Sequence, residues 1–350
     1  MDSLQVKKIY YIANVRMPTE RAHGIQIVKM CEAFANRGVE VELVVPKRKT
    51  DVELSLFDYY GAKENFKIKK LWCLDTVKFG WLGFWIELIT FTKMVIFYTM
   101  FKNGVFYTRD EFIAMWLKLW GKQVIWEAHM GQKNIFVRRL IAMKVSMVAI
   151  SQGLRDLYIK LGVPREKILV AADGVDLDKF KTQISKSEAR EELGLDKDKK
   201  LIIYTGSRQP WKGVETLEKA AELITDAEVL IVSGKSPKDI PLYLRAADVL
   251  VLPNTAKEEI SRLYTSPMKL FEYMASSRPI IASDIPSLRE IVDDSMVNFF
   301  TPDDSADLSR VIASTFDNYD DALTKADKSL KIVQNYSWQR RARAIMESIK

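Results

Sequence analysis

A glycine turn with two cationic side chains follows a predicted strand in the second half of the chain. The strand Leu201–Thr205 runs into TGSRQPWKG, which places Gly206, Arg208 and Lys212 ahead of a helix that begins near Gly213. Arginine and lysine beside a glycine turn and a helix N-terminus attract the oxygens of a diphosphate. This turn is therefore predicted to bind a phosphorylated ligand.

A second run, SPMKLFEYMA, offers a complementary set of groups. Ser266 and Pro267 lead into a helix whose first amides, at Met268 and Lys269, are free to face an anion. Glu272 lies one turn further along among apolar neighbours, so its carboxylate is half-buried and needs a partner. A carboxylate in that place is suited to accept hydrogen bonds from both hydroxyls of a ribose. Together the two runs predict a nucleotide site.

The elements that must position these residues alternate between strand and helix, which favours parallel α/β sheets. In the first half, strands are predicted at 8–14, 39–45, 105–108, 123–126 and 147–150, with helices at 25–37 and 153–161. In the second half, strands are predicted at 201–205, 229–233, 249–252 and 279–282, with helices at 214–224, 241–247, 268–275, 286–292 and from 337. Ligands of such sheets bind beyond the carboxyl ends of the strands.

A polar stretch, 181–200, separates the two series and is interpreted as a linker region. We therefore predict an N-terminal domain at 1–180, a C-terminal domain at 181–335 and a final helix at 336–350 that returns to the first domain. Both domains are predicted to be Rossmann-like and doubly wound, and to face each other across a cleft.

Charge is distributed unevenly along the chain. Residues 1–160 hold 25 Lys and Arg against 15 Asp and Glu, and residues 161–350 hold 28 against 31, which gives the net charge of +7. A basic first half suits an anionic partner such as a bilayer surface, although surface charge that serves only solubility explains it equally well. The two cysteines, Cys31 and Cys73, form no framework, and the N-terminus resembles no secretory signal, so we expect a cytoplasmic protein.

The segment Phe79–Phe101 is apolar and as long as a membrane span. Glu87 and Lys93 near its centre offset the apolar gain, because each charge costs about 2.5–3.5 kcal/mol there. Its place between two strands of one sheet predicts a helix packed on that sheet. Its surplus aromatic residues then rest in a bilayer interface, or the helix is wholly buried.

Several runs together resemble the retaining glycosyltransferases of family 4, which have the GT-B fold. They include RAHGIQIVKMCEAFANRGVEVELVVP, ISQGLRDLYIKLGVPREKILVAADGVDLDKF, YTGSRQPWKGVETL, AADVLVLPN, SPMKLFEYMASSRPIIASDIPSLREIV and YSWQRRA. The resemblance spans nearly the whole chain in the family's order. It implies transfer of a hexose-type sugar from a nucleotide-diphosphate donor with retained anomeric configuration, no metal and no cofactor.

The resemblance also implies roles for individual residues. Arg208 and Lys212 neutralise the donor diphosphate, assisted by Gly206 and by the backbone of Ser266, Pro267, Met268 and Lys269, while Glu272 holds the ribose. His129 faces the transferred sugar, and Gly24 lets the backbone approach the phosphates. His23, the chain's second histidine, lies beside Gly24 and is equally consistent with a structural role.

Three departures from the family pattern concern the donor. Tyr264 stands where relatives carry a glutamate that contacts sugar hydroxyls, and Glu258 or Glu259 is a displaced substitute. Asp173 replaces an asparagine of the family. The stretch 229–248 holds one strand–helix step where relatives have two, so base recognition near 234–237 is only a hypothesis.

The acceptor is predicted to be lipid-linked or a glycan, met at the inner face of the membrane through 79–101 and the basic first half. No nucleic acid partner is expected. Two other functions stay open: a nucleotide-sugar epimerase of the same fold, and a non-catalytic scaffold that binds glycans or nucleotides. The DxD sequences at 176–178 and 196–198 fall in a loop and in the charged linker, which disfavours a metal site.

Overall fold

The computed structural model describes residues 6–50, 52–181 and 184–349, which form two compact units. The first unit contains residues 1–150, 154–171 and 338–350, and the second contains 151–153 and 172–337, where they are described. Apart from the short segment 151–153, the chain passes from the first unit to the second near Ala171 and back near Ser337. The polar stretch 181–200 lies inside the second unit, and the final helix belongs to the first.

The first unit is built on a parallel sheet of seven strands in the order β3-β2-β1-β4-β5-β6-β7. Its strands are β1 (Lys8–Ile12), β2 (Glu40–Pro46), β3 (Lys67–Leu71), β4 (Val105–Thr108), β5 (Gln123–Ala128), β6 (Ser146–Ala149) and β7 (Ile168–Val170). Its α-helices are α1 (Ala22–Ala35), α2 (Leu56–Tyr60), α3 (Gly80–Thr99), α4 (Glu111–Leu119), α5 (Ile135–Ala142), α6 (Gln152–Lys160) and α14 (Trp338–Ser348), with 3-10 turns η1 (Val77–Phe79) and η2 (Arg165–Lys167).

The second unit has a parallel sheet of five strands in the order β12-β11-β10-β8-β9. Its strands are β8 (Lys200–Thr205), β9 (Ala227–Val232), β10 (Val249–Leu252), β11 (Ile280–Ser283) and β12 (Asn298–Phe300). Its helices are α7 (Lys186–Leu193), α8 (Val214–Ala221), α9 (Ile240–Ala246), α10 (Met268–Ala275), α11 (Pro286–Arg289), α12 (Ser305–Asp317) and α13 (Tyr319–Val333), with turns η3 (Leu177–Phe180), η4 (Pro210–Lys212) and the π-helical η5 (Ile260–Tyr264).

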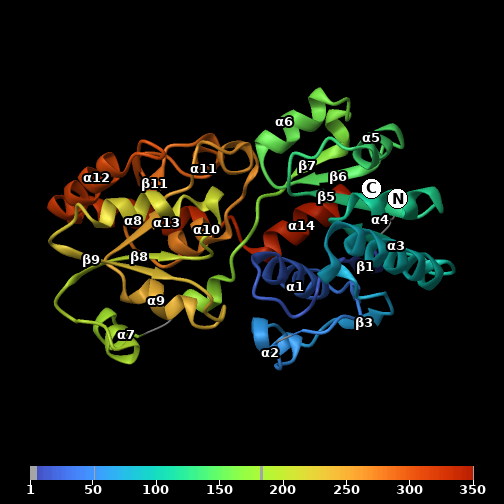
Figure 1. Cartoon of the computed structure of the whole chain (residues 1–350), viewed down its shortest axis with the longest axis horizontal. Coiled ribbons are helices and arrows are strands. Elements are labelled where there is room, and N and C mark those ends of the chain that lie inside the picture. Colours follow the sequence, from blue (N-terminus) through green and yellow to red (C-terminus); the bar gives the residue numbers. More distant parts are fainter. Residues whose placement is uncertain (1–5, 51, 182–183, 350) are drawn as a thin grey trace. The chain divides into compact units, whose positions relative to one another are not determined.

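Helices cover both faces of the second sheet, which explains why its strands are almost continuously apolar (Figure 1). Successive side chains of β8 point to opposite faces, so Leu201 and Ile203 join one buried cluster while Ile202 and Tyr204 join the other. The two clusters fix the sheet between its helices. The polar groups lie outside these clusters, at the carboxyl ends of the strands, where the chain continues into the helices.

The prediction of two parallel, doubly wound sheets is confirmed. Helix α14 contacts α1, as expected for a final helix that returns to the first domain. Between β9 and β10 the second unit has a single helix, α9, so the short stretch holds one strand–helix step and leaves β9 at the edge of the sheet.

Candidate functional site

Two predicted site residues, Gly206 and Lys269, meet at the carboxyl edge of the second sheet. Lys269 reaches from α10 and donates a hydrogen bond from Nζ to the hydroxyl of Tyr204 at 2.6 Å. Gly206 follows β8 with φ of +136°, and a Cβ added there would lie 2.9 Å from Nζ of Lys269. The glycine therefore makes room for the lysine in addition to adopting a backbone conformation that other residues avoid.

Lys212 lies beside Lys269 and gives the site a second, half-buried amine. Its Nζ is 3.6 Å from the centroid of the Trp211 ring, and burial lowers the pKa of Lys212 to about 7 although Asp173 opposes the shift. Burial and the charge of Lys212 together hold the pKa of Lys269 well below its usual value. Two neighbouring amines that both favour the neutral form are arranged for an anion, which would let both be protonated.

The helix start that was expected to assist the anion is present. Helix α10 begins at Met268, with Pro267 as its N-cap rather than in its first turn, and no side chain caps it. Its first amides cannot be satisfied within the helix, so they remain available to an anion. The hydroxyl of Ser266 instead accepts a hydrogen bond from the amide of Asp173 at 2.9 Å, so this side chain holds the preceding loop in place.

Glu272 lies one turn along α10 and is half-buried. Burial raises its pKa to about 7, against the opposing charges of Lys179 and Lys269. Within the described part of the chain its carboxylate has no hydrogen-bond partner. A partly buried carboxylate without donors is costly, and a diol would supply two donors.

Four other residues were considered for the donor, namely Arg208, Tyr264, Glu258 and Glu259. Arg208 is about half-exposed and forms an ion pair with Glu218 of α8, so its charge is already partnered. Tyr264 is 8% exposed, and its hydroxyl lies 3.4 Å from a carboxylate oxygen of Glu259. Of the two glutamates considered as substitutes, Glu259 is thus the one that contacts Tyr264, whereas Glu258 has an exposed side chain with no such contact.

In the first unit, a buried carboxylate at the end of β5 organises the surroundings of His129. Glu127 is 0% exposed and accepts four hydrogen bonds or ion pairs. The donors are Gln26 at 2.5 Å, the Nη2 of Arg341 at 3.1 Å, the hydroxyl of Tyr107 and the Nε2 of His129. The network joins β4, β5, α1 and the final helix α14.

The charges in this network determine the form of His129. Burial opposes ionisation of Glu127, but Arg341 and His129 together lower its pKa to about 2. Burial and Arg109 lower the pKa of His129 to about 4. The neutral imidazole therefore donates from Nε2 to Glu127, which leaves Nδ1 as a hydrogen-bond acceptor.

His23 and Gly24 also lie near this network. His23 occupies the first turn of α1, and burial together with Arg109 lowers its pKa to about 4. Gly24 has a packing role, because a Cβ there would lie 2.1 Å from the hydroxyl of Tyr60. That hydroxyl accepts from the amide of Thr19 and donates to its carbonyl, so the glycine allows Tyr60 to hold the loop after β1.

The sequence reasoning missed most of the polar network of the first unit. The missed residues are Gln26, Tyr107, Arg109, Glu127 and Arg341. Arg109 and Glu127 stand at or beside the ends of predicted strands, and that position was a usable signal. Arg341 gave none, because its contact with Glu127 is set only by the folding of the last helix onto the first unit.

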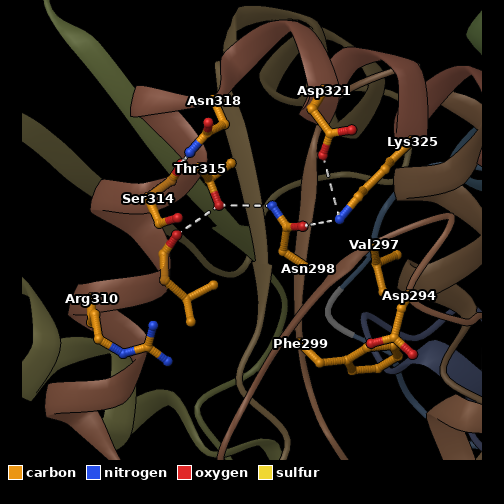
Figure 2. A pocket seen from close by; sticks show the side chains of 11 residues that line it. Asp294, Val297, Asn298, Phe299, Arg310, Ser314, Thr315, Asn318, Asp321 and Lys325 are labelled. Atoms are coloured by element: carbon orange, nitrogen blue, oxygen red, sulfur yellow. Dashed lines mark hydrogen bonds and ion pairs between the residues drawn. The ribbon is translucent and has the colours of Figure 1, made fainter.

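A pocket of about 290 Å³ lies elsewhere in the second unit, against β12, α12 and α13 (Figure 2). Its polar side chains largely satisfy one another: Asn298 donates to Thr315 at 2.9 Å and accepts from Lys325 at 2.7 Å. Asn298 begins β12, so this pocket is at the amino edge of the sheet, opposite Gly206 and Lys212. We assign it no part in the site.

Comparison with known proteins finds a family match within the second unit. Residues 196–318 match the family described as glycosyl transferases group 1. A D-inositol 3-phosphate glycosyltransferase of Mycobacteroides abscessus is 29% identical over 159 residues, covering 39% of this chain and 36% of the relative. The putative teichuronic acid biosynthesis glycosyltransferase TuaC of Bacillus subtilis is 26% identical over 167 residues, covering 42% and 41%. The alignments thus span well under two thirds of these relatives.

Among solved structures, Anabaena Alr3699/HepE in complex with UDP-glucose superposes with a TM-score of 0.76. The two share 16% sequence identity, and the match covers 97% of this chain and 98% of that one. This likeness confirms the predicted GT-B fold class.

Proposed function

We propose that the protein is a glycosyltransferase that takes a hexose from a nucleotide-diphosphate donor bound in its second unit. The observation that carries the proposal is a pair of amines at the carboxyl edge of the sheet, the buried Lys269 and the half-buried Lys212. Burial lowers the pKa of both lysines, and the charge of Lys212 lowers that of Lys269 further. A diphosphate reverses this, because its charge offsets the desolvation of both ammonium groups.

The remaining groups fit the other parts of such a donor. The free amides at the start of α10 add to the diphosphate site, and Glu272 accepts hydrogen bonds from the ribose hydroxyls. Arg208 exchanges its ion pair with Glu218 for the diphosphate; the pair is exposed, so little stability is lost in the exchange. Tyr264 is proposed to meet the sugar, because the resemblance assigns its position to a sugar-contacting glutamate, and Glu259 beside it is proposed as the substitute carboxylate.

We propose that transfer retains the anomeric configuration and needs no metal. The cationic side chains stabilise the charge that grows on the diphosphate as the glycosidic bond breaks, which is the work a metal would otherwise do. Glu127, the carboxylate nearest His129, has both oxygens engaged by four donors and is not free to attack a sugar. The leaving diphosphate is then the base that deprotonates the acceptor.

The acceptor is proposed to be a lipid-linked sugar or a glycan, and His129 to contact the transferred hexose through its free Nδ1. We place the enzyme in the cytoplasm, in agreement with two buried thiols, Cys31 and Cys73, that form no disulfide. Because the structural relative binds UDP-glucose, UDP-glucose is the first donor to test.

The test is release of nucleoside diphosphate from a panel of nucleotide sugars, with and without simple glycan or lipid-phosphate acceptors. Lys212→Ala should lower the rate of nucleoside diphosphate release by a factor of about 10²–10³, because a transition-state contact of this kind contributes about 3 kcal/mol. Lys219→Ala, an exposed lysine paired with Glu215 on α8, is the matched control and should leave the rate unchanged. Conversion of the sugar nucleotide without release indicates an epimerase. Binding without either reaction indicates a scaffold, and both outcomes refute the proposal.

A further inference from the structure

Helix α3 and the 3-10 turn before it (Val77–Thr99) are long and apolar enough to cross a membrane. A third of the residues in its apolar 18-residue stretch are nevertheless buried within the protein. Its inner face, with Leu88, Phe91 and Val95, packs into the core. Glu87 also points inward: it is 0% exposed, accepts from Asn14 at 3.1 Å and lies 3.8 Å from Arg48. The acidic residue that opposed burial in a membrane is therefore turned away from the outer face.

The outer face of the same helix is an apolar stripe that Lys93 alone interrupts. Leu82, Ile86, Ile89 and Phe97 recur at helical spacing, and Phe101 extends the row beyond the helix end. They are 58%, 44%, 40%, 72% and 92% exposed. The helical part of the row covers about 22 Å. A soluble protein gains nothing by exposing such a row to water, so the face is arranged for contact.

The stripe continues onto the neighbouring helices. The ring of Trp85 contacts Phe112 of α4 and Phe136 of α5, with centroids 5.9 Å apart in each case, so the three helices form one surface. Further apolar side chains exposed on it or beside it are Phe79, Trp81, Phe84, Trp116, Leu119, Trp120 and Ile135. Tryptophans are numerous among them, as in segments that lie at the boundary between lipid tails and headgroups.

Cations lie along this surface, which we call the α3 surface. Lys93 stands within the stripe, and Lys78 lies over the ring of Phe79 at 5.1 Å. Helix α5 adds Arg138 and Arg139, both exposed. A row of apolar side chains bordered by lysine and arginine matches a layer whose interior is hydrocarbon and whose surface is negative.

We propose that the α3 surface binds an anionic lipid bilayer, with α3 lying flat at the level of the headgroups. The buried half of α3, and Glu87 within it, hold the helix on the sheet, so the helix does not cross the membrane. The bordering cations favour lipid over a second copy of this chain, because two copies would bring these cations against each other. The proposal stands on the first unit alone and does not depend on the sugar transfer.

The experiment is sedimentation of the full chain with vesicles of phosphatidylcholine, alone or mixed with phosphatidylglycerol. Wild-type protein should bind the mixed vesicles and bind less as salt is raised. The double variant Phe97→Glu with Phe101→Glu should lose at least tenfold in its partition constant, since each phenylalanine gives up its apolar contact. Both side chains are largely exposed, so the melting temperature should not change.

The matched control is Leu223→Glu with Ile332→Glu, which adds the same two negative charges at exposed apolar positions of the second unit. This control should bind vesicles as the wild type does. Wild-type protein that fails to bind mixed vesicles, or a double variant that binds them normally, overturns the proposal. A wild-type dimer in gel filtration that the double variant converts to monomer, without vesicle binding, assigns the surface to a second copy and also overturns it.

Discussion

Replacing Arg341 by methionine tests whether the last helix controls the charge at His129. The pair it breaks is deeply buried: the side chain of Arg341 is 2% exposed and that of Glu127 0%. Methionine fills a similar volume but leaves the carboxylate uncompensated. Breaking one partner of a buried pair costs about 3–5 kcal/mol.

The pKa of Glu127 gives a second route to that magnitude. The arginine and His129 lower this pKa from 4.5 to about 2, and a shift of that size corresponds to about 3 kcal/mol of unfolding free energy. Because the folded-state pKa is depressed, this stabilisation is present above pH 4.5 and is lost as the pH falls toward 2. We expect Arg341→Met to destabilise the first unit by about 3 kcal/mol at pH 7.

Urea unfolding followed by tryptophan fluorescence measures this loss. Arg343→Met on the same helix is the control, because its pair with Glu347 is exposed and should contribute under about 0.5 kcal/mol. NMR titration of His129 adds a readout that packing alone would not move: its pKa should rise in the Arg341 variant, since Arg341 is one of the charges that lower it. Equal losses in the two variants, or a cost that stays the same between pH 7 and pH 3, would refute the reasoning.

Three further predictions concern titrating groups. Pyrophosphate should bind more weakly as the pH rises above 7, by up to about tenfold per pH unit, because it requires Lys212 to be protonated; calorimetry should show this, and Lys212→Arg should reduce the pH dependence. Glu272→Gln should raise the melting temperature at pH 8, because it removes a carboxylate whose pKa of about 7 makes its ionised form costly. The same variant should bind UDP more weakly but pyrophosphate as tightly as the wild type, and equal losses of affinity for both would contradict a ribose contact. The contribution of His129 to the unfolding free energy should fall by about 3 kcal/mol as the pH is lowered from 6.5 to 4, because its folded-state pKa is depressed to about 4. In the His129→Gln variant the unfolding free energy should decline less over this pH range, as denaturation curves at several pH values will show.

Much of the fold followed from local pattern. Strands such as β4 and β10 are short apolar runs buried on both faces, and such runs between turn residues are read directly from sequence. Strand β3 was missed because its sequence, KIKKL, is that of an edge strand with exposed lysines, which resembles a loop. Strand β12 was missed because three residues hold too little pattern.

The site in the second unit was predictable to the extent that it depends on chain order. Gly206 and Lys212 follow a strand directly, and Glu272 follows a helix start, so sequence alone brought them together. The side chain of Lys269 was not foreseen as part of the site, because only the packing of α10 on β8 carries its Nζ to Tyr204. Glu218, the partner of Arg208, was missed for the same reason. A contact between a loop and one face of a helix leaves no periodic pattern in the sequence that would predict it.

The two sets of polar residues differ in how far they are satisfied without a ligand. Glu127 has four donors, whereas Lys212, Lys269 and Glu272 each carry a pKa moved toward the neutral form. Under the proposed function, a nucleotide would reverse both shifts in the second unit, because its diphosphate favours protonated lysines and its ribose favours an ionised Glu272. A proton that leaves the glutamate therefore balances one that a lysine takes up. We therefore expect the site to exchange few protons with solvent when a whole nucleotide binds. When pyrophosphate alone binds, the site should take up protons from the solvent.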